Sequence, residues 1–292
     1  MNSIATLTPT RPRTLQPAFA PVRECKCCGS DAHLSGYADF DRDCYGYNQR
    51  RSQASGVVVP YYRCAQCDFA FSDFFDDWSS QDFKQHVYND EYGLFDPNFA
   101  DVRPHKTAKR VAALARSPQT RILDYGCGNG RTIELLREAG YQHVVGFDPY
   151  HAEPQPPQGG PFDFVICVEV AEHTTQPLQL FAELAQHAAP HGVILLSTRD
   201  FAEVKGRWVD DWYVAPRNGH VSFYTQRTLK LLRELRTTGP AKPALPPEVL
   251  PPVVAGLVVR DNLRQRRAIE RAYVEALSRA RSEEHTSELQ SP

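Results

Sequence analysis

Two glutamates and two histidines are the residues of this sequence best suited to move a proton or to bind a metal ion. Glu169, Glu172 and His173 follow an apolar run, and His220 opens a later His-Val-Ser-Phe-Tyr stretch. If Glu169 opens a helical turn, the first three side chains share one face at the carboxyl end of a strand. An imidazole with a pKa of about 6.5 can accept a proton near neutral pH. We predict His220, His173 and Glu172 as catalytic residues, with His220 as the general base.

The same residues allow two other interpretations. Carboxylates and imidazoles together can hold a divalent ion, which lowers the pKa of a hydroxyl bound to it. Mg²⁺ held by Glu169, Glu172, His173 and His220 is therefore one alternative. The other is that Glu169 contacts a cofactor, while Glu172 and His173 only stabilise the start of a helix.

A second group of residues has the spacing of a nucleoside-binding loop. Asp124 ends an apolar run, and glycines follow it at positions 126, 128 and 130. Glycine is needed where a loop takes a positive φ and its backbone touches a ligand. A second apolar run ends in Asp148, whose carboxylate can accept hydrogen bonds from both ribose hydroxyls. Arg131 stands where a dinucleotide-binding loop has its third glycine, so the spacing favours a different nucleoside cofactor.

The elements that must position these residues alternate between strands and helices. Apolar runs predict four buried strands, at 122–124, 144–147, 162–168 and 193–197. Helices are predicted at 132–139, 178–188 and 228–236. This order predicts a Rossmann-like, doubly wound α/β sheet. Between Asp148 and Asp163 the sequence is rich in Pro, Gly and Gln, which predicts a loop.

The sequence around the glycines resembles motif I of the class I S-adenosylmethionine (SAM) methyltransferases. The stretch from Phe162 through His173 to the run after Gly192 resembles the fourth and fifth strands of the same family, so that the resemblance covers about residues 119–230. It implies SAM as the cofactor. The positions that would bind it are Asp124, Gly126, Cys127, Gly128 and Gly130 for the methionine part, Asp148 for the ribose, and Glu169.

Narrower resemblances point to different acceptors. The Glu-x-x-Glu-His sequence with a later histidine is similar to metal-dependent small-RNA terminal 2′-O-methyltransferases, and without that histidine to ubiquinone-pathway O-methyltransferases. The His-x-Ser-x-Tyr order resembles sugar C-methyltransferases. We expect methyl transfer to a small hydroxylated acceptor, such as a sugar or a natural-product intermediate. The alternatives are metal-assisted RNA 2′-O-methylation and a non-catalytic binding protein with a vestigial SAM fold.

Four of the eight cysteines form two Cys-x-x-Cys pairs, Cys25 with Cys28 and Cys64 with Cys67. Four thiolates suit one tetrahedral Zn²⁺ and leave no open position for water, so we predict a structural zinc site in a zinc-ribbon-like module. Reduced thiols without a metal are the alternative, and Cys27 competes with its neighbours as a ligand. Each pair is followed by a residue suited to a left-handed backbone, Gly29 or Asp68.

Arginines and tyrosines between the two cysteine pairs could present a surface to RNA. They are Arg42, Tyr45, Tyr47, Arg50, Arg51, Tyr61, Tyr62 and Arg63. Several aspartates dilute their charge, so nucleic acid is possible as a partner but a small-molecule acceptor is favoured. Two further groups could either face a ligand or only pack the domain. They are Tyr88, Tyr92 and Arg103 as a lid, and Trp208, Trp212 and Tyr213 as a pocket wall.

Composition and patterning divide the chain into six parts. They are a disordered leader (1–22), the cysteine module (23–75), a helical connector or lid (76–118), the SAM-binding domain (119–237), a Pro-rich segment and helix that is truncated or frameshifted (238–280), and 281–292. The last part matches the translation of a sequencing-adapter oligonucleotide, so we expect it to be non-native and the natural C-terminus to be missing. A net charge of -2 and the lack of an apolar run near 20 residues favour a cytoplasmic protein without membrane contact.

Overall fold

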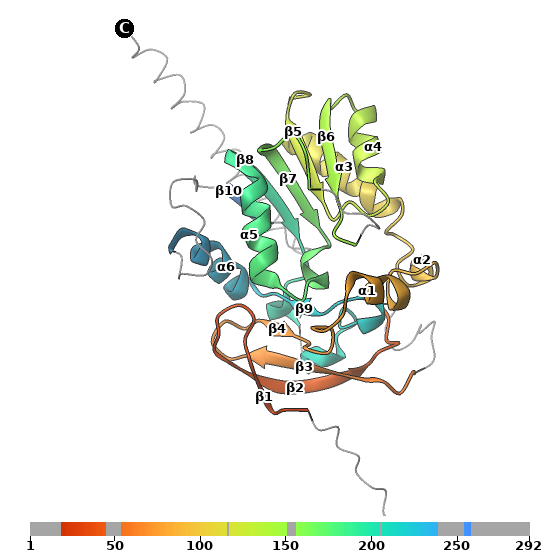
Figure 1. Ribbon diagram of the computed structural model, residues 1–292, viewed down its shortest axis with the longest axis vertical. Coiled ribbons are helices and arrows are strands. Elements are labelled where there is room, and N and C mark those ends of the chain that lie inside the picture. The colour runs from red at the N-terminus through yellow and green to blue at the C-terminus, as the bar shows by residue number, and fades with distance from the viewer. Residues whose placement is uncertain are drawn as a thin grey trace, which may run out of the picture.

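A computed structural model describes residues 19–44, 54–115, 117–150, 156–204, 206–238 and 254–257. It contains two sheets of five strands each. Figure 1 shows the parallel sheet in the upper part of the molecule and the antiparallel sheet below it, with the short helices α1 and α2 at the side between them. The functional residues predicted from the sequence therefore have to be placed relative to both sheets.

The parallel sheet has the strand order β10-β8-β7-β5-β6. Its members are β5 (Arg121–Tyr125), β6 (His143–Phe147), β7 (Phe162–Val168), β8 (Ala188–Ser197) and β10 (Val254–Leu257). Every neighbouring pair is parallel. The predicted Rossmann-like α/β class is confirmed, because buried parallel strands are what continuous apolar runs form.

Helices connect these strands and cover both faces of the sheet. Helix α4 (Arg131–Glu138) links β5 to β6, and α5 (Pro177–His187) links β7 to β8. Helix α3 (Val102–Leu114) packs against α4, and α6 (Gln226–Thr238) packs against α5. Of the residues between β6 and β7, those that are described (148–150 and 156–161) form no helix or strand, in line with the short Pro-rich stretch.

The antiparallel sheet has the order β1-β2-β3-β4-β9 and draws on both halves of the chain. Strands β1 (Val22–Glu24), β2 (Asp31–Asp39), β3 (Val58–Cys64) and β4 (Ala70–Phe71) belong to the cysteine module, whereas β9 (Ser222–Phe223) begins two residues after His220. Residues Ala70 and Phe71 pair with Phe223 and Ser222. The module therefore shares its sheet with the stretch that was predicted to be catalytic.

One hydrophobic core runs between the two sheets. Phe69 and Phe71 of the cysteine module lie in the same buried cluster as Leu123 and Val165 of the parallel sheet, with Tyr224 beside β9. Burying a side chain of this size stabilises a fold by about 1.5–3 kcal/mol. The aromatic residues that follow the second cysteine pair thus hold the module against the parallel sheet.

The connector differs from its predicted outline. From the sequence one helix is expected over Asp82–Tyr92 within the helical connector, but the chain forms two, α1 (Ser80–His86) and α2 (Tyr92–Phe95). Ser79 caps α1, because its hydroxyl accepts from the Asp82 N–H while the Asp82 carboxylate accepts from the Ser79 N–H. Pro104 was expected at the first position of the next helix and instead lies at the third position of α3, still in the first turn.

Strand β10 pairs with β8 and stands at one end of the strand order. The helix predicted within 238–280 lies outside the described residues, as does most of the predicted leader. None of the described helices is both long enough and apolar enough to span a membrane.

Candidate functional site

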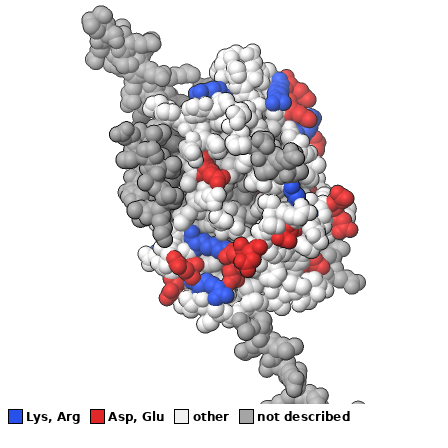
Figure 2. All heavy atoms as spheres, in the orientation of Figure 1, with Lys and Arg blue, Asp and Glu red and all other residues white. Residues whose placement is uncertain are grey.

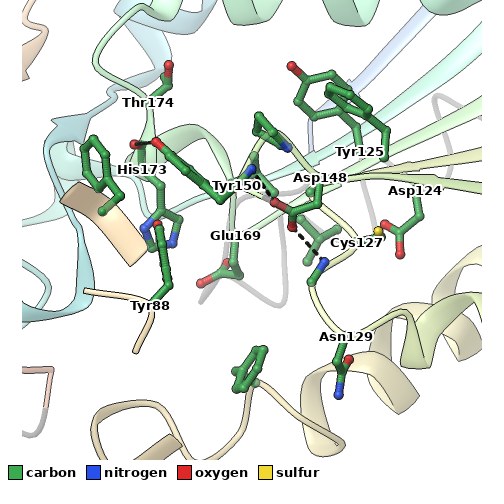
Figure 3. Close-up of a pocket in the computed structure, with 18 of the residues that line it drawn as sticks. Tyr88, Asp124, Tyr125, Cys127, Asn129, Asp148, Tyr150, Glu169, His173 and Thr174 are labelled. Carbon is green, nitrogen blue, oxygen red and sulfur yellow. Dashed lines mark hydrogen bonds between the residues drawn. The ribbon is translucent and has the colours of Figure 1, made fainter. Parts of the chain in front are cut away.

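A cavity of about 840 Å³ lies at the carboxyl ends of β5, β6 and β7. In Figure 3 the side chains of Asp124, Cys127, Asn129 and Asp148 occupy one side of it, and those of Tyr88, Tyr150 and His173 occupy the other. Glu169 projects between the two groups. The carboxyl edge of a parallel sheet is where this fold class binds its ligands.

The glycine loop forms the first side of the cavity. Gly126, Gly128 and Gly130 have φ values of 78°, 53° and 78°, which favour glycine. A Cβ atom on Gly126 would lie 2.4 Å from Cγ2 of Val170, so the close approach of these two segments also needs a glycine. The loop therefore presents its backbone to the cavity. Because glycine has no Cβ atom, a cofactor can approach this backbone closely.

Asp148 closes this side of the cavity at the end of β6. One carboxylate oxygen accepts from the Gly128 N–H at 2.9 Å, and the other accepts from the Tyr150 N–H at 2.8 Å. The carboxylate is thereby fixed against the loop, and each oxygen keeps a lone pair for a further donor. The arrangement suits the ribose hydroxyls that the sequence analysis assigned to Asp148.

Asp124 and Cys127 lie deeper in the same wall. Asp124 is buried, and burial together with the nearby charge of Asp148 raises its pKa to about 7. Burial also raises the pKa of the Cys127 thiol to about 12, so this thiol stays protonated. Asp124 is thus poised to gain a full negative charge when a cationic group binds beside it.

The segment after β7 does not form the predicted helical face. Glu169 has a φ of 56°, and only Ala171–His173 forms a short 3₁₀ turn. The Glu169 N–H donates to the carbonyl of Ser197, which continues the sheet and prevents a helix from starting at Glu169. The expectation that Glu169, Glu172 and His173 share one helix face is therefore wrong. Instead Glu169 lines the cavity and accepts a hydrogen bond from the Ser197 hydroxyl at 3.1 Å.

His173 lines the cavity beside Glu169. Its Nδ1 lies 3.2 Å from the carbonyl oxygen of Gly219 and donates to it in the neutral tautomer, which leaves Nε2 as an acceptor. Burial, with a contribution from the positive charge of Arg103, lowers the pKa of His173 to about 4. The ring is thus neutral and oriented at physiological pH.

His220 and Glu172 are not among the described residues that line the cavity. The His220 ring lies behind that of His173, with 4.9 Å between ring centroids, and its Nδ1 lies 2.8 Å from the carbonyl oxygen of Tyr213. Glu172 is fully buried and accepts a hydrogen bond from the Tyr213 hydroxyl. One ligand atom from each of Glu172, His173 and His220 lies within 4.8 Å of the others. The fold therefore brings the three predicted catalytic residues together, with only His173 at the cavity.

The predicted Mg²⁺ site is not supported by this geometry. The cluster of potential ligands contains Glu172, His173 and His220 but not Glu169. Two imidazoles and one carboxylate suit Zn²⁺ or Fe²⁺, whereas Mg²⁺ prefers oxygen ligands.

The connector supplies the wall that faces His173. Tyr88, Tyr92 and Arg103, whose role was left open, all line the cavity. The Arg103 guanidinium makes two hydrogen bonds to the Asp96 carboxylate, at 2.8 and 2.9 Å. Tyr150 also lines the cavity and was missed; its place two residues after Asp148 was the one available signal.

Three aromatic residues that could have walled a pocket instead pack the domain. None of Trp208, Trp212 and Tyr213 is among the described lining residues. Trp208 and Tyr213 are buried against Phe201 and Phe223, and Trp212 lies beneath the Arg199 guanidinium on the surface.

The four cysteines of the two pairs meet at one point. Cys25 and Cys67 have their sulfurs 3.5 Å apart, as do Cys28 and Cys64, and all four sulfurs lie within 4.8 Å of one another. Tetrahedral zinc thiolates have sulfurs about 3.8 Å apart. Gly29 and Asp68 have φ values of 74° and 65°, as the two tight turns require.

Cys27 lies outside this group of four. It is buried, and burial raises the pKa of its thiol. By contrast, hydrogen bonds from the Cys67 thiol and from backbone N–H groups lower the pKa of Cys25 to about 5. Cys25 and Cys28, and not Cys27, are thus the members of the first pair whose sulfurs lie in the cluster of four.

Comparison with known proteins adds to this geometry. A family model described as "Methyltransferase domain" matches residues 99–236. The chain is 34% identical over 102 residues to a ubiquinone biosynthesis O-methyltransferase of Aromatoleum aromaticum, covering 27% of this chain and 43% of the relative. It is 30% identical over 115 residues to the protein of that description from Xanthomonas campestris pv. campestris, covering 30% and 46%. The chain thus spans less than half the length of these curated relatives.

A solved structure from Thermotoga maritima, described as a SAM-dependent methyltransferase and possible histamine N-methyltransferase, aligns at a TM-score of 0.30 and 18% identity. The alignment covers 47% of this chain and 77% of that protein. A likeness of this extent is weak by itself. The family match is stronger, because its segment contains strands β5 to β8, the glycine loop and most of the cavity wall. Over residues 99–236 the chain is therefore similar to methyltransferase domains.

Proposed function

We propose that this chain transfers a methyl group from SAM to a hydroxyl of a small acceptor, with His173 as the proton acceptor. The observation that carries the proposal is the division of one cavity into a glycine-loop side with Asp148 and an opposite side with His173. SAM, when bound, supplies an electrophilic methyl group. The protein has to hold the acceptor in line with that group and remove the acceptor's proton.

We propose His173 rather than His220 for the proton transfer, because among the described lining residues only His173 is a histidine. With SAM bound, Nε2 of His173 would take the acceptor's hydroxyl proton, because Nδ1 is held by the Gly219 carbonyl. His220 and Glu172 lie within reach behind the ring and can stabilise the charged imidazolium or take the proton onward. We therefore propose His220 as a positioning residue, in place of the base role expected from the sequence.

We assign the parts of the cofactor from the two acids on the glycine-loop side of the cavity, Asp124 and Asp148. We propose that Asp148 binds the ribose, that Gly126, Cys127, Gly128 and Gly130 cradle the methionine part, and that Asp124 faces its ammonium group. Calorimetry with SAM on the full chain, with NAD as the control ligand, tests this step. Binding of NAD but not SAM would contradict it. Turnover with radiolabelled SAM then distinguishes an enzyme from a non-catalytic binding protein with a vestigial SAM fold.

The raised pKa of Asp124 gives a pH-dependent prediction. A cation beside Asp124 favours its carboxylate form, so binding releases a proton while Asp124 is protonated in the free protein. We expect SAM affinity to rise with pH up to about 7, by at most about tenfold per pH unit, and then to level off. Calorimetry between about pH 5.5 and pH 8.5 measures this. Asp124→Asn should flatten the profile, and a flat profile in the unmodified protein would contradict the assignment.

A metal ion at Glu172, His173 and His220 is a second candidate. It is favoured by one observation: both histidines donate from Nδ1 to backbone carbonyls, as metal-binding histidines usually do. In that case a transition-metal ion, not a base, would lower the pKa of the acceptor hydroxyl. Turnover that falls with a chelator and returns with Zn²⁺ or Fe²⁺, while the four-cysteine site keeps its metal, would replace the base proposal.

We also propose that Cys25, Cys28, Cys64 and Cys67 bind one structural Zn²⁺. Structural zinc contributes directly to folding, by about 10–16 kcal/mol in small peptides. We expect about one zinc per chain in the purified protein, and Cys64→Ser should lose it and lower the unfolding temperature strongly. Cys27→Ala is the matched control, since Cys27 is also buried and lies between Cys25 and Cys28 but outside the sulfur cluster. Metal analysis with zinc retained in Cys64→Ser would show that the ligand set is wrong.

RNA as the acceptor receives less support. Arg42, Tyr61 and Tyr62 are buried, and the Arg42 guanidinium donates to the backbone carbonyls of 209–211. These three residues cannot form the basic aromatic surface considered from the sequence; Tyr45, Tyr47, Arg50 and Arg51 lie outside the described residues. Figure 2 shows acidic and basic side chains intermixed on the face it presents. Retention on single-stranded RNA at moderate salt would restore this alternative.

A further inference from the structure

A short turn before His220 carries two buried polar side chains that the proposed reaction does not use, those of Arg217 and Asn218. We call residues 216–219 the anchor turn. Two hydrogen bonds tie it to the cysteine module. The Arg217 N–H donates to the carbonyl of Arg42 at 3.1 Å, and the Cys44 N–H donates to the side-chain oxygen of Asn218 at 2.9 Å. The anchor turn is therefore fixed to the lower sheet of the molecule.

The Arg217 guanidinium binds the carboxyl end of helix α1. One of its nitrogens donates to the carbonyl of Val87, the C-cap residue of α1, at 2.9 Å, and another donates to the side-chain oxygen of Asn89 at 3.1 Å. The guanidinium also lies 4.0 Å from the centroid of the Phe95 ring, at the end of α2. The last carbonyls of a helix have no partner within it, and a cation is favourable there. Arg217 thus contacts both short helices of the connector.

Asn218 binds the end of the second helix. Its side-chain nitrogen donates to the carbonyl of Phe95, the last residue of α2, at 3.0 Å. Two adjacent side chains thus bind both ends of the stretch 87–95. The lining residues of this stretch all lie between the two bound carbonyls; they are Tyr88, Asn89, Asp90, Tyr92 and Gly93.

Backbone hydrogen bonds within the connector do not attach this stretch to either sheet. The N–H groups of Val87 and Tyr88 donate to Phe83, and that of Tyr92 donates to Asn89. The bonds from Arg217 and Asn218, by contrast, come from a turn that is fixed to the cysteine module. They therefore determine where the lining stretch lies relative to the rest of the cavity.

The anchor turn also contacts His173. The Gly219 carbonyl oxygen lies 3.2 Å from Nδ1 of His173, and a Cβ on Gly219 would lie 3.1 Å from the Tyr88 hydroxyl oxygen. In Figure 3 Tyr88 and His173 lie on the same side of the cavity. Beyond α2 the connector reaches the glycine loop, where the Asn129 side chain donates to the Ala100 carbonyl at 3.1 Å. Movement of α1 and α2 would therefore change the cavity at His173 and beside the glycine loop.

We infer that the anchor turn holds α1 and α2 closed over the bound cofactor, with Arg217 and Asn218 as positioning residues for methyl transfer. The inference rests on the proposed binding of SAM and adds the contacts that control its release. A ligand enclosed by a lid leaves when the lid opens. Loss of the bonds to Val87 and Phe95 makes opening easier, so it should speed dissociation more than it changes association.

The dissociation rate of S-adenosylhomocysteine, the demethylated cofactor, tests the inference by stopped-flow measurements on the full chain. Arg217→Met keeps the length of the side chain but removes its donors. We expect it to raise the dissociation rate by at least about tenfold and to change the association rate by less than about threefold. Arg217→Lys keeps a cationic donor and should restore slow dissociation in part, whereas a purely space-filling role would leave Lys no better than Met. Arg207→Met is the control, since Arg207 is exposed and outside the described lining.

Amide hydrogen exchange separates opening of the lid from general unfolding. In Arg217→Met and in Asn218→Ala, exchange should become faster over 87–95, while strands β5 and β7 keep their protection. Unchanged dissociation in both variants would overturn the inference, and so would loss of protection in the parallel sheet together with the lid. Failure of the unmodified chain to bind S-adenosylhomocysteine would instead contradict the proposed function, and with it the inference that rests on it.

Discussion

Replacing His173 with alanine is expected to lower kcat for methyl transfer by about 10²–10⁴-fold, the usual contribution of a positioned general base. SAM affinity should stay within about twofold, because the glycine loop and Asp148 lie on the other side of the cavity. The reason is geometric: His173 is the histidine of the described cavity lining, and its tautomer is set by the Gly219 carbonyl. Single-turnover rates at saturating SAM measure the effect.

Two other histidines provide the comparison. His187→Ala removes a half-buried imidazole on α5 outside the described lining and should leave kcat nearly unchanged. His220→Ala should fall between the two, because His220 contacts the His173 ring but does not line the cavity. If His220→Ala abolishes turnover while His173→Ala retains it, the base is His220 and the cavity must open further in the bound state.

Gly126→Ala is expected to weaken SAM binding by more than tenfold and to lower the unfolding temperature. The added Cβ would lie 2.4 Å from the Val170 side chain, and the φ of 78° disfavours any residue with a Cβ. Relief of this contact requires the loop or the segment after β7 to move, and both line the cavity. Calorimetry for SAM and thermal unfolding report the two effects separately.

Gly130→Ala tests the effect of backbone strain in the absence of the contact with Val170. Gly130 has the same φ of 78°, but a Cβ there meets no atom within 4 Å. It should therefore cost about 1–2 kcal/mol of stability from backbone strain and leave the Val170 contact intact. Equal losses of SAM affinity in both variants would show that strain, not the contact with Val170, governs the loop.

The strands of the parallel sheet could be predicted because each is a continuous apolar run that needs no partner to be recognised. The glycine loop could be predicted as well, since glycines at alternate positions indicate a backbone with positive φ values. The turn at Glu169 could not be predicted. Its residue types favour a helix, and the backbone hydrogen bond from Glu169 to Ser197, together with the packing of Val170 on Gly126, overrides that local preference.

Contacts between segments that lie far apart in the chain also could not be predicted from the sequence. Nothing in the types of His173 and His220 indicates which ring faces the cavity, because that depends on how the turn after β7 meets the stretch before β9. Strand β9 is only Ser222–Phe223 and gives no periodic signal. Its pairing with β4 depends on tertiary packing, because the two sheets share one hydrophobic core.

This pairing sets an order for folding during synthesis. The four cysteines and strands β1 to β4 precede the strands of the parallel sheet in the chain, so they leave the ribosome before that sheet can form. The edge of β4 then waits, unpaired, until the chain beyond Phe223 has been made. Such long-range closure is slow, and an exposed strand edge invites pairing with other chains. We expect nascent chains that stop before Ser222 to aggregate through β4. In the complete chain, the cysteine module forms first and then provides the strand edge with which β9 pairs.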